Sequence, residues 1–317
     1  MSNEAFTRRS FLSTLPAAAA LCGCARDPQE GPTGTLEKVW GRRGKGAGYF
    51  QKPRAMAIDA EDLLYIVDMT ANIQVFTRDG EYVRRWKTPE SINGRPTGLT
   101  IDRECNVCVA DTQYFRILVY TRQGKLLDDR TIGGESGSVP GKFNFVTDIA
   151  QDSHGDYYIA EYGEFDRIQK FSPSGKFLLQ WGGHGTALGE FIRPQSIMCD
   201  DQDRLWVADA CNHRIQIFEV EDNQAKLVQS WGEQGSALGR LNYPYGLQLD
   251  GEGHVYLCEF GNHRVQKFTL NGELVGWWGS NGRRDGELCQ PWTAQLDSRG
   301  RLHVLDSYNH RVQRIRL

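Results

Sequence analysis

The sequence lacks a clear excess of charge of either sign. Its 37 lysines and arginines stand against 40 aspartates and glutamates, which leaves a formal net charge of −3 over 317 residues. Proteins that bind nucleic acids or anionic lipid usually carry a basic stripe or patch. The charge balance favours neither partner, and we expect no binding to nucleic acid. Hydrophobic residues make up 39% of the chain, which is enough for a folded core and is not the composition of a disordered protein.

Cysteine spacings that bind metal or haem are missing as well. Cys105 and Cys108 form a CxxC pair, but no second pair matches it and no histidine follows directly, as haem attachment would require. The other cysteines beyond residue 25 stand singly: Cys199, Cys211, Cys258 and Cys289. The sequence therefore gives no reason to expect a cofactor.

An apolar segment long enough to remain in a membrane as a helix is also lacking. The nearest candidate is an alanine-rich run that follows the paired arginines of Thr7–Leu12 (TRRSFL) and ends at Leu21–Cys24 (LCGC). A basic start, a short apolar stretch and small residues are typical of an export signal. The paired arginines resemble a twin-arginine (Tat) signal, and LCGC resembles the cleavage box of a lipoprotein.

These features predict how the chain begins and where the protein is located. We expect residues 1–24 to be a Tat-like lipoprotein signal peptide and residues 25–34 to be a tether. Cys24 would then carry lipid, and the exported protein would be anchored on the periplasmic or cell-surface side of a membrane. The alternative is a secretory signal that is cut elsewhere and leaves no lipid.

The sequence is rich instead in a repeated pattern of short strands and turns. In each copy an apolar strand ends in an acid, as in LWVAD at 205–209 and VYLCE at 255–259. Six such acids recur at intervals of 43 to 50 residues: Asp68, Asp111, Glu161, Asp209, Glu259 and Asp306. Between copies lies a Trp-Gly signature that ends in proline, as in Trp231–Pro244. Similarity at this period indicates a repeat architecture.

Each copy contains segments for four strands. The first follows the proline (Pro244–Asp250), the second ends at the acid, the third has the form of Arg264–Phe268 (RVQKF), and a glycine turn leads to the fourth. Four short strands per repeat predict a blade of a β-propeller, which buries both faces against neighbouring blades. We therefore predict an all-β fold in which residues 35–317 form a six-bladed β-propeller of four-stranded antiparallel blades.

The two ends of the repeat region predict how the ring closes. The last copy stops after its third strand, whereas Leu36–Gly41 (LEKVWG) has the sequence of a fourth strand and precedes the first copy. Pairing of these segments would leave no free sheet edge. We expect the N-terminal strand to complete the last blade.

The third strands carry a recognisable motif. NHRIQIF at 212–218, NHRVQKF at 262–268 and NHRVQRI at 309–315 resemble NHL repeats. This resemblance implies a six-bladed propeller related to the lyase domain of peptidylglycine alpha-amidating enzymes and, more distantly, to lactonases. In those lyases, residues just after the strand-opening proline include histidines that bind zinc, and calcium-dependent lactonases surround their ion with Glu, Asn and Asp. This chain has none of these residues at those positions, so we predict no metal site and no catalytic residue.

The histidines of the three motifs, His213, His263 and His310, could suggest a metal site of their own. Equivalent positions in neighbouring blades are a blade's width apart, so these side chains need not converge on one ion. A structural role is favoured. In it, the Asn, His and Arg of each motif fix the loop between the second and third strands and bind the acid at the end of the second.

Functional residues of such propellers surround the central channel, and the residue after each strand-opening proline should point there. These positions hold Arg54, Thr97, Thr147, Gln195, Tyr245 and Trp292, and Tyr162 and Phe260 should lie on the same face. Large aromatics beside one arginine are typical of a recognition surface. The alternative is that the aromatics only plug the mouth of the channel.

The resulting hypothesis is a binding function rather than catalysis. We expect a monomeric ligand- or protein-binding scaffold of the cell envelope, whose partner is an envelope protein or a small ligand bound at the loop face. The alternative is a metal-dependent lyase or lactonase-like hydrolase with a displaced site at the central channel.

Overall fold

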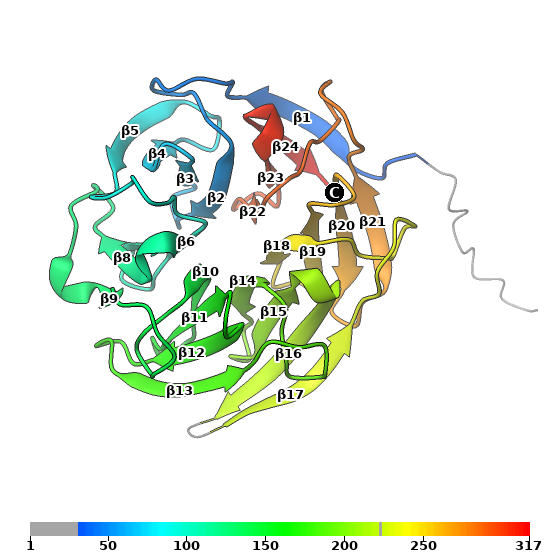
Figure 1. Cartoon of the computed structure of the whole chain (residues 1–317). Helices are drawn as coiled ribbons and strands as arrows, with labels where there is room; N and C mark the ends of the chain where they lie inside the picture. The colour runs from blue at the N-terminus through cyan, green and yellow to red at the C-terminus, as the bar shows by residue number, and fades with distance from the viewer. Residues whose placement is uncertain (1–30, 222–223) are drawn as a thin grey trace, which may run out of the picture. The chain divides into compact units, whose positions relative to one another are not determined.

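The computed structural model describes residues 31–221 and 224–317. In this part of the chain, six four-stranded antiparallel sheets surround a central axis as the blades of a propeller (Figure 1). The all-β, six-bladed fold predicted from the sequence is confirmed. The predicted signal peptide, the lipidation site at Cys24 and residues 25–30 of the predicted tether lie outside the described residues.

Within each of the first five blades, the strands follow one another from the axis to the rim in sequence order. The first three blades consist of β2 (Pro53–Ile58), β3 (Leu64–Asp68), β4 (Asn72–Phe76) and β5 (Tyr82–Lys87); β6 (Gly98–Ile101), β7 (Val107–Asp111), β8 (Arg116–Tyr120) and β9 (Ile132–Gly133); and β10 (Phe145–Gln151), β11 (Tyr157–Tyr162), β12 (Arg167–Phe171) and β13 (Phe177–Gly182). The next two consist of β14 (Pro194–Cys199), β15 (Leu205–Asp209), β16 (Arg214–Glu221) and β17 (Gln224–Trp231); and β18 (Pro244–Leu249), β19 (His254–Glu259), β20 (Arg264–Thr269) and β21 (Leu274–Trp278). The sixth combines β22 (Ala294–Leu296), β23 (Leu302–Asp306) and β24 (Arg311–Arg316) with β1 (Thr35–Trp40).

The hydrophobic core lies between the blades, because each sheet buries both of its faces. All five residues of β15 are buried. Leu205 and Val207 belong to a cluster shared with the third blade, whereas Trp206 and Ala208 belong to a cluster shared with the fifth. Successive side chains of a strand point to opposite faces. This two-sided burial explains why the second strands are apolar at nearly every position instead of alternating with polar residues.

β1 closes the ring, as predicted. It pairs antiparallel with β24, with Leu36 opposite Ile315 and Trp40 opposite Val312. The Trp40 ring also reaches the first blade, where its centroid lies 4.8 Å from that of Phe76. The N-terminal strand therefore completes the sixth blade and joins it to the first.

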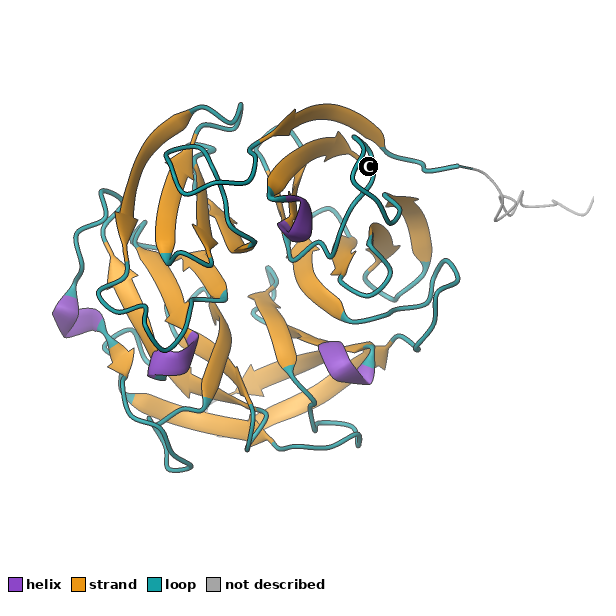
Figure 2. Ribbon diagram, turned by 45° about the horizontal axis from the view of Figure 1, so that its top comes forward, coloured by secondary structure: helices purple, strands orange, loops and turns teal. Residues whose placement is uncertain are grey.

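The outer edge of the second blade is shorter than the others. β9 has two residues, and a short 3₁₀ helix, η2 (Asp128–Arg130), precedes it. Three further 3₁₀ helices, η1 (Thr112–Tyr114), η3 (Ala210–Asn212) and η4 (Ser307–Asn309), lie between the second and third strands of their blades (Figure 2). In residues 31–221 and 224–317, no helix is both long enough and apolar enough to cross a membrane.

Candidate functional site in the central channel

The innermost strands of the six blades line a central channel. β2, β6, β10, β14, β18 and β22 contact one another in this order around the axis, and β22 contacts β2 in turn. The channel contains a cavity of about 570 Å³. Pockets that hold small organic molecules have volumes of this order. The channel is therefore large enough for a ligand.

The histidines of the Asn-His-Arg motifs fasten each blade to the next. Each has a left-handed backbone, with φ between 55° and 58°, and its Nδ1 accepts a hydrogen bond from the backbone N–H of the residue before the next proline. These bonds run from Tyr243 to His213 (3.1 Å), from Gln290 to His263 (3.0 Å) and from Lys52 to His310 (2.9 Å). Burial lowers the pKa of all three histidines. The lowered pKa favours the neutral ring, in which Nδ1 can accept.

The prediction for these motifs is confirmed for the asparagine and the arginine and is wrong for the histidine. Asn212 and Arg214 both donate to the buried carboxylate of Asp209, at 2.9 and 2.8 Å. Arg214 also donates to the carbonyls of Thr186 and Ala187, at 2.8 Å each. The histidine binds the next blade instead of the acid in its own blade, so the motif fixes its own loop and joins it to the next blade.

A β-bulge opens the innermost strand in four of the blades. In β14, Pro194 lies opposite Asp209 and Ser196 lies opposite Ala208, so Gln195 is the extra residue. A bulge bends its strand and redirects the side chains beside it. As a result, Gln195 and Ser196 both line the cavity, although they are neighbours in a strand.

The structure brings most of the predicted binding residues to the cavity. Five of the six that follow the strand-opening residues line it: Arg54, Thr97, Gln195, Tyr245 and Trp292. Thr147 does not, since its buried hydroxyl donates a hydrogen bond to the carbonyl of Pro194 at 2.6 Å. Tyr162 and Phe260 also lie outside the cavity wall. The guanidinium of Arg193 lies 4.6 Å from the centroid of the Tyr162 ring.

Tyr245, Phe260 and Trp292 form an aromatic cluster. The rings of Tyr245 and Phe260 stack with their centroids 4.5 Å apart, and Trp292 meets Tyr245 edge-on at 5.1 Å. The guanidinium of Arg54 lies 5.4 Å from the Trp292 ring centroid, and that of Arg193 lies 5.3 Å from the Tyr245 centroid. Tyr245 and Trp292 are each only 8% exposed. Most of each ring therefore packs against protein, and a small part is left to meet a ligand.

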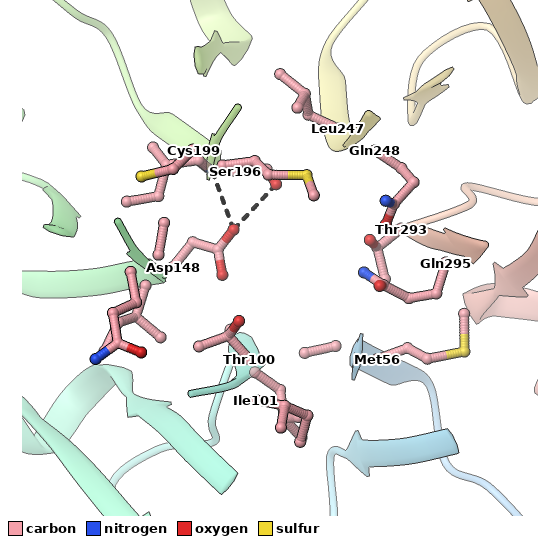
Figure 3. A pocket seen from close by; sticks show the side chains of 18 of the residues that line it. Met56, Thr100, Ile101, Asp148, Ser196, Cys199, Leu247, Gln248, Thr293 and Gln295 are labelled. Carbon is pink, nitrogen blue, oxygen red and sulfur yellow. Dashed lines mark hydrogen bonds between the residues drawn. The ribbon is translucent and has the colours of Figure 1, made fainter. Parts of the chain in front are cut away.

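Asp148 of β10 points into the cavity and was not predicted from the sequence (Figure 3). Its Oδ2 accepts hydrogen bonds from the Ser196 hydroxyl and the Ile197 N–H, both at 3.0 Å. Burial raises the pKa of Asp148 to about 7. The opposite wall carries three polar side chains: Gln248, Thr293 and Gln295 (Figure 3).

The sequence contained a signal for this group. Asp148 is the second residue after Val146, which takes the place of the strand-opening proline of the other blades. At the same position the other five blades have small or hydroxyl-bearing residues: Ala55, Gly98, Ser196, Gly246 and Thr293. A single carboxylate at a position that is otherwise small and uncharged indicates a special environment.

The channel does not offer the donor set of a metal site. Within residues 31–221 and 224–317, no three His, Cys, Asp or Glu side chains converge on a point that a metal ion could occupy. Asp148 is held by a hydroxyl and a backbone N–H, and it faces amides and hydroxyls. These donors do not fit the zinc or calcium sites that the resemblance to lyases and lactonases would imply, and no metal-dependent step follows from them.

Sequence comparison finds relatives with NHL repeats. A model of the NHL repeat matches residues 191–218, 241–268 and 288–315. The chain is 30% identical over 200 residues to peptidylglycine alpha-amidating monooxygenase of Rattus norvegicus, covering 59% of this chain and 19% of that protein. It is also 30% identical over 184 residues to NHL repeat-containing protein 3 of Homo sapiens, covering 53% and 52%. The matches span less than a fifth of the length of the rat and Xenopus laevis amidating monooxygenases.

Solved structures share the fold at low sequence identity. An auxiliary nutrient binding protein from Bacteroides ovatus has a TM-score of 0.65 at 18% identity, covering 87% of this chain and 71% of that one. Virginiamycin B lyase from Staphylococcus aureus has a TM-score of 0.59 at 12% identity, covering 90% and 99%. A gluconolactonase from Xanthomonas campestris has a TM-score of 0.61 at 14% identity, covering 84% and 86%. The chain is a six-bladed β-propeller with NHL repeats, distantly related to the amidating monooxygenases and to NHL repeat-containing protein 3.

Proposed function

We propose that the protein is a binding protein of the cell envelope that takes a ligand into its central channel. The observation that carries this proposal is the cavity of about 570 Å³, whose wall includes Arg54, Tyr245 and Trp292. Pockets lined by aromatic rings with a few polar or charged groups are typical of sites for organic molecules. The rings would contact the apolar part of the ligand, while Arg54 would bind an acidic or hydrogen-bonding group.

The burial of the aromatics supports a small ligand over a protein partner. Protein interfaces are anchored by large aromatics that enter pockets of the partner, whereas Tyr245 and Trp292 are each 8% exposed. A molecule inside the channel would still reach both rings, since both border the cavity. The envelope protein expected from the sequence stays the alternative.

Changes at these residues should weaken binding. We expect the propeller (residues 32–317) to retain a small molecule from an extract of the cell envelope, as measured by equilibrium dialysis and mass spectrometry. Tyr245→Ala and Trp292→Ala should each lower the affinity by a factor of roughly thirty to a thousand, the range for a buried aromatic contact. Arg54→Met should lower the affinity at least roughly tenfold, because it removes the charge and keeps the length of the side chain.

Thermal unfolding distinguishes a lost contact from a damaged fold. Trp292→Ala also removes packing within the aromatic cluster and should lower the melting temperature. Arg54 is half-buried and belongs to no hydrophobic cluster of the described residues, so its replacement tests binding with little effect on stability. Arg85→Met, in rim strand β5, is the matched control and should bind as wild type. Lost stability with unchanged retention in both aromatic variants would mean that the rings only plug the channel.

We further propose that the protein is held in the envelope by lipid on Cys24. The LCGC sequence at Leu21–Cys24 supports this site. Because the thiol accepts the lipid, Cys24→Ser should stay unprocessed and should take up no labelled fatty acid. Several acyl chains hold a protein firmly where a single chain does not, so the wild type should sediment with membranes. Recovery of all wild-type protein in the soluble envelope fraction would contradict the anchor.

The similarity to the amidating monooxygenase over 59% of this chain supports a second candidate, a metal-dependent lyase or hydrolase. Protein stripped of metal that regained lyase or lactonase turnover with zinc or calcium would favour this candidate. The binding function comes first because the donor groups in the channel do not match such a metal site.

A further inference from the structure

Asp148 is a carboxylate that the protein surrounds without giving it a cationic partner. Its two hydrogen-bond donors, the Ser196 hydroxyl and the Ile197 N–H, are uncharged. No charged group of the described residues contributes to the shift of its pKa, which burial raises to about 7. Most buried acids of the described residues are paired with a cation, as Asp209 is with Arg214 at 2.8 Å, whereas Asp68 is held, like Asp148, by uncharged donors. Asp148 is half-buried, so its carboxylate has lost part of its hydration without gaining a cation in return.

One oxygen of Asp148 is left for a ligand. Oδ2 accepts both hydrogen bonds, and the other oxygen points into the cavity (Figure 3). Gly98 on the neighbouring strand β6 packs closely against this side of Asp148. A methyl group at Gly98 would lie 2.9 Å from Asp148 Oδ1 and 2.4 Å from the carbonyl of Thr147. Glycine at position 98 therefore lets β6 approach the carboxylate closely.

Acids outnumber bases along the channel wall. The wall contains five acids, Asp148, Asp152, Asp200, Asp201 and Asp203, and two bases, Arg54 and Arg103. Lys170 and Arg204 lie outside the wall and pair with Asp152 and Asp200. Counting both still leaves five acids against four bases. The wall together with these partners therefore carries a formal charge of −1.

The wall opposite Asp148 offers uncharged hydrogen-bonding groups. Gln248, Thr293 and Gln295 lie there (Figure 3). Amide and hydroxyl side chains can both donate and accept hydrogen bonds. This wall would therefore suit the hydroxyl or amide groups of a polar ligand.

We propose that the channel binds a small molecule with a protonated amine, which pairs with Asp148 while its hydroxyl or amide groups meet the opposite wall. The inference rests on the proposed function, in that the channel is the ligand site, and it adds the charge of the ligand. An ammonium group supplies the missing cation, and its hydrogen bonds to a carboxylate are charge-assisted and strong.

A matched pair of probes tests the amine. Glucamine is a linear amino polyol, and sorbitol has a hydroxyl where glucamine has its amine. Calorimetry at pH 7.5 should show that glucamine binds the propeller at least roughly tenfold more tightly than sorbitol. Asp148→Asn keeps the shape and an oxygen acceptor but removes the charge, so it should abolish this preference. Asp201→Asn removes an exposed carboxylate of the same wall and should leave the preference intact.

The preference should also fade as Asp148 takes up its proton. With a pKa of about 7, the ionised fraction falls from about three quarters at pH 7.5 to about 3% at pH 5.5, so the affinity for glucamine should fall toward that for sorbitol, by at most about 25-fold. Sorbitol should bind equally at both values. This pKa has no contribution from the other charged side chains of the wall or from the Cys199 thiol of β14.

Three results would overturn the amine site: equal binding of both probes, no binding of glucamine to the wild type, or an undiminished preference in Asp148→Asn. Asp148→Asn has no charge that must lose its hydration, so its melting temperature at pH 7.5 should be no lower than that of the wild type. That result would show that the fold of the variant is intact. If Asp148→Asn retained the envelope ligand as well as the wild type does, the amine site would be ruled out and binding in the channel would stand. A preference for glucamine with unchanged retention in Arg54→Met would leave the amine site standing and would remove Arg54 from the ligand site.

Discussion

A chain that begins at Arg42, and so lacks β1, should melt well below a chain that begins at Pro32. Without β1, the edge of β24 has no partner and the Trp40 ring no longer packs on Phe76 and Phe50, whose centroids lie 4.8 and 5.9 Å from it. Removal of a fully buried large aromatic costs about 3–5 kcal/mol, and although Trp40 is only half-buried, the loss of β1 also removes its backbone pairing with β24. At about 2–4 °C per kcal/mol, the melting temperature should fall by about 10 °C or more.

The chain that begins at Pro32 is the matched control. It keeps β1 and also keeps Thr33, which exchanges backbone and side-chain hydrogen bonds with Trp277 of β21. A synthetic peptide with residues 32–41 should restore part of the stability when added to the shorter chain, since it can pair with the exposed edge of β24. The shorter chain should also self-associate in gel filtration, because a free edge pairs readily with another chain. Equal melting temperatures for the two chains would mean that closure by β1 contributes little.

The closure illustrates what the sequence could predict. The fold follows from local patterns that repeat: apolar strands, turn residues and a missing fourth strand that Leu36–Gly41 supplies. Each pattern reflects a requirement that every blade must meet, so six copies reinforce one another. The order of the strands and their pairing needed no long-range information beyond this repetition.

The histidine of the motif shows where such reasoning ends. From one repeat, His310 was expected to act within its own loop, but its Nδ1 accepts a bond from Lys52, which lies 258 residues away in the sequence. This contact exists because the ring brings the last blade beside the first. Pattern reasoning could identify the loop and could not give the partner, since the partner lies in another copy.

The site was predicted in part for a related reason. The rule that the residue after the opening position faces the channel gives Tyr245 and Trp292, but it fails at Thr147, which binds the carbonyl of Pro194. Which of two neighbours in a bulged strand reaches the cavity depends on local packing. In the third blade the next residue, Asp148, reaches it instead. The sequence marked Asp148 as unusual and did not say that it faces a cavity.

Loss of the ion pair between Arg214 and Asp209 should strongly destabilise the fourth blade. Arg214→Met should destabilise the protein by about 3–5 kcal/mol, because it leaves a buried carboxylate without its cation. It also removes donors to the carbonyls of Thr186, Ala187 and Glu190, which fix the loop before the blade. Denaturant unfolding measures the loss. Lys142→Met is the control, since its pair with Glu135 has a similar length of 2.7 Å but is exposed, and it should cost less than about 1 kcal/mol.

The pH dependence of this loss identifies the carboxylate as its cause. Burial already raises the pKa of Asp209, and the hydrogen bonds and charge of Arg214 lower it. Without the arginine the pKa must rise further, and a carboxyl whose pKa is raised in the folded state favours folding at low pH and loses that contribution as pH rises through the folded pKa. The stability gap between wild type and Arg214→Met should therefore be smaller at pH 5 than at pH 8. Asp209→Asn combined with Arg214→Met has no buried charge, so it should recover part of the stability at pH 8 and show no such dependence. A gap that is the same at both pH values would assign the loss to the loop contacts instead.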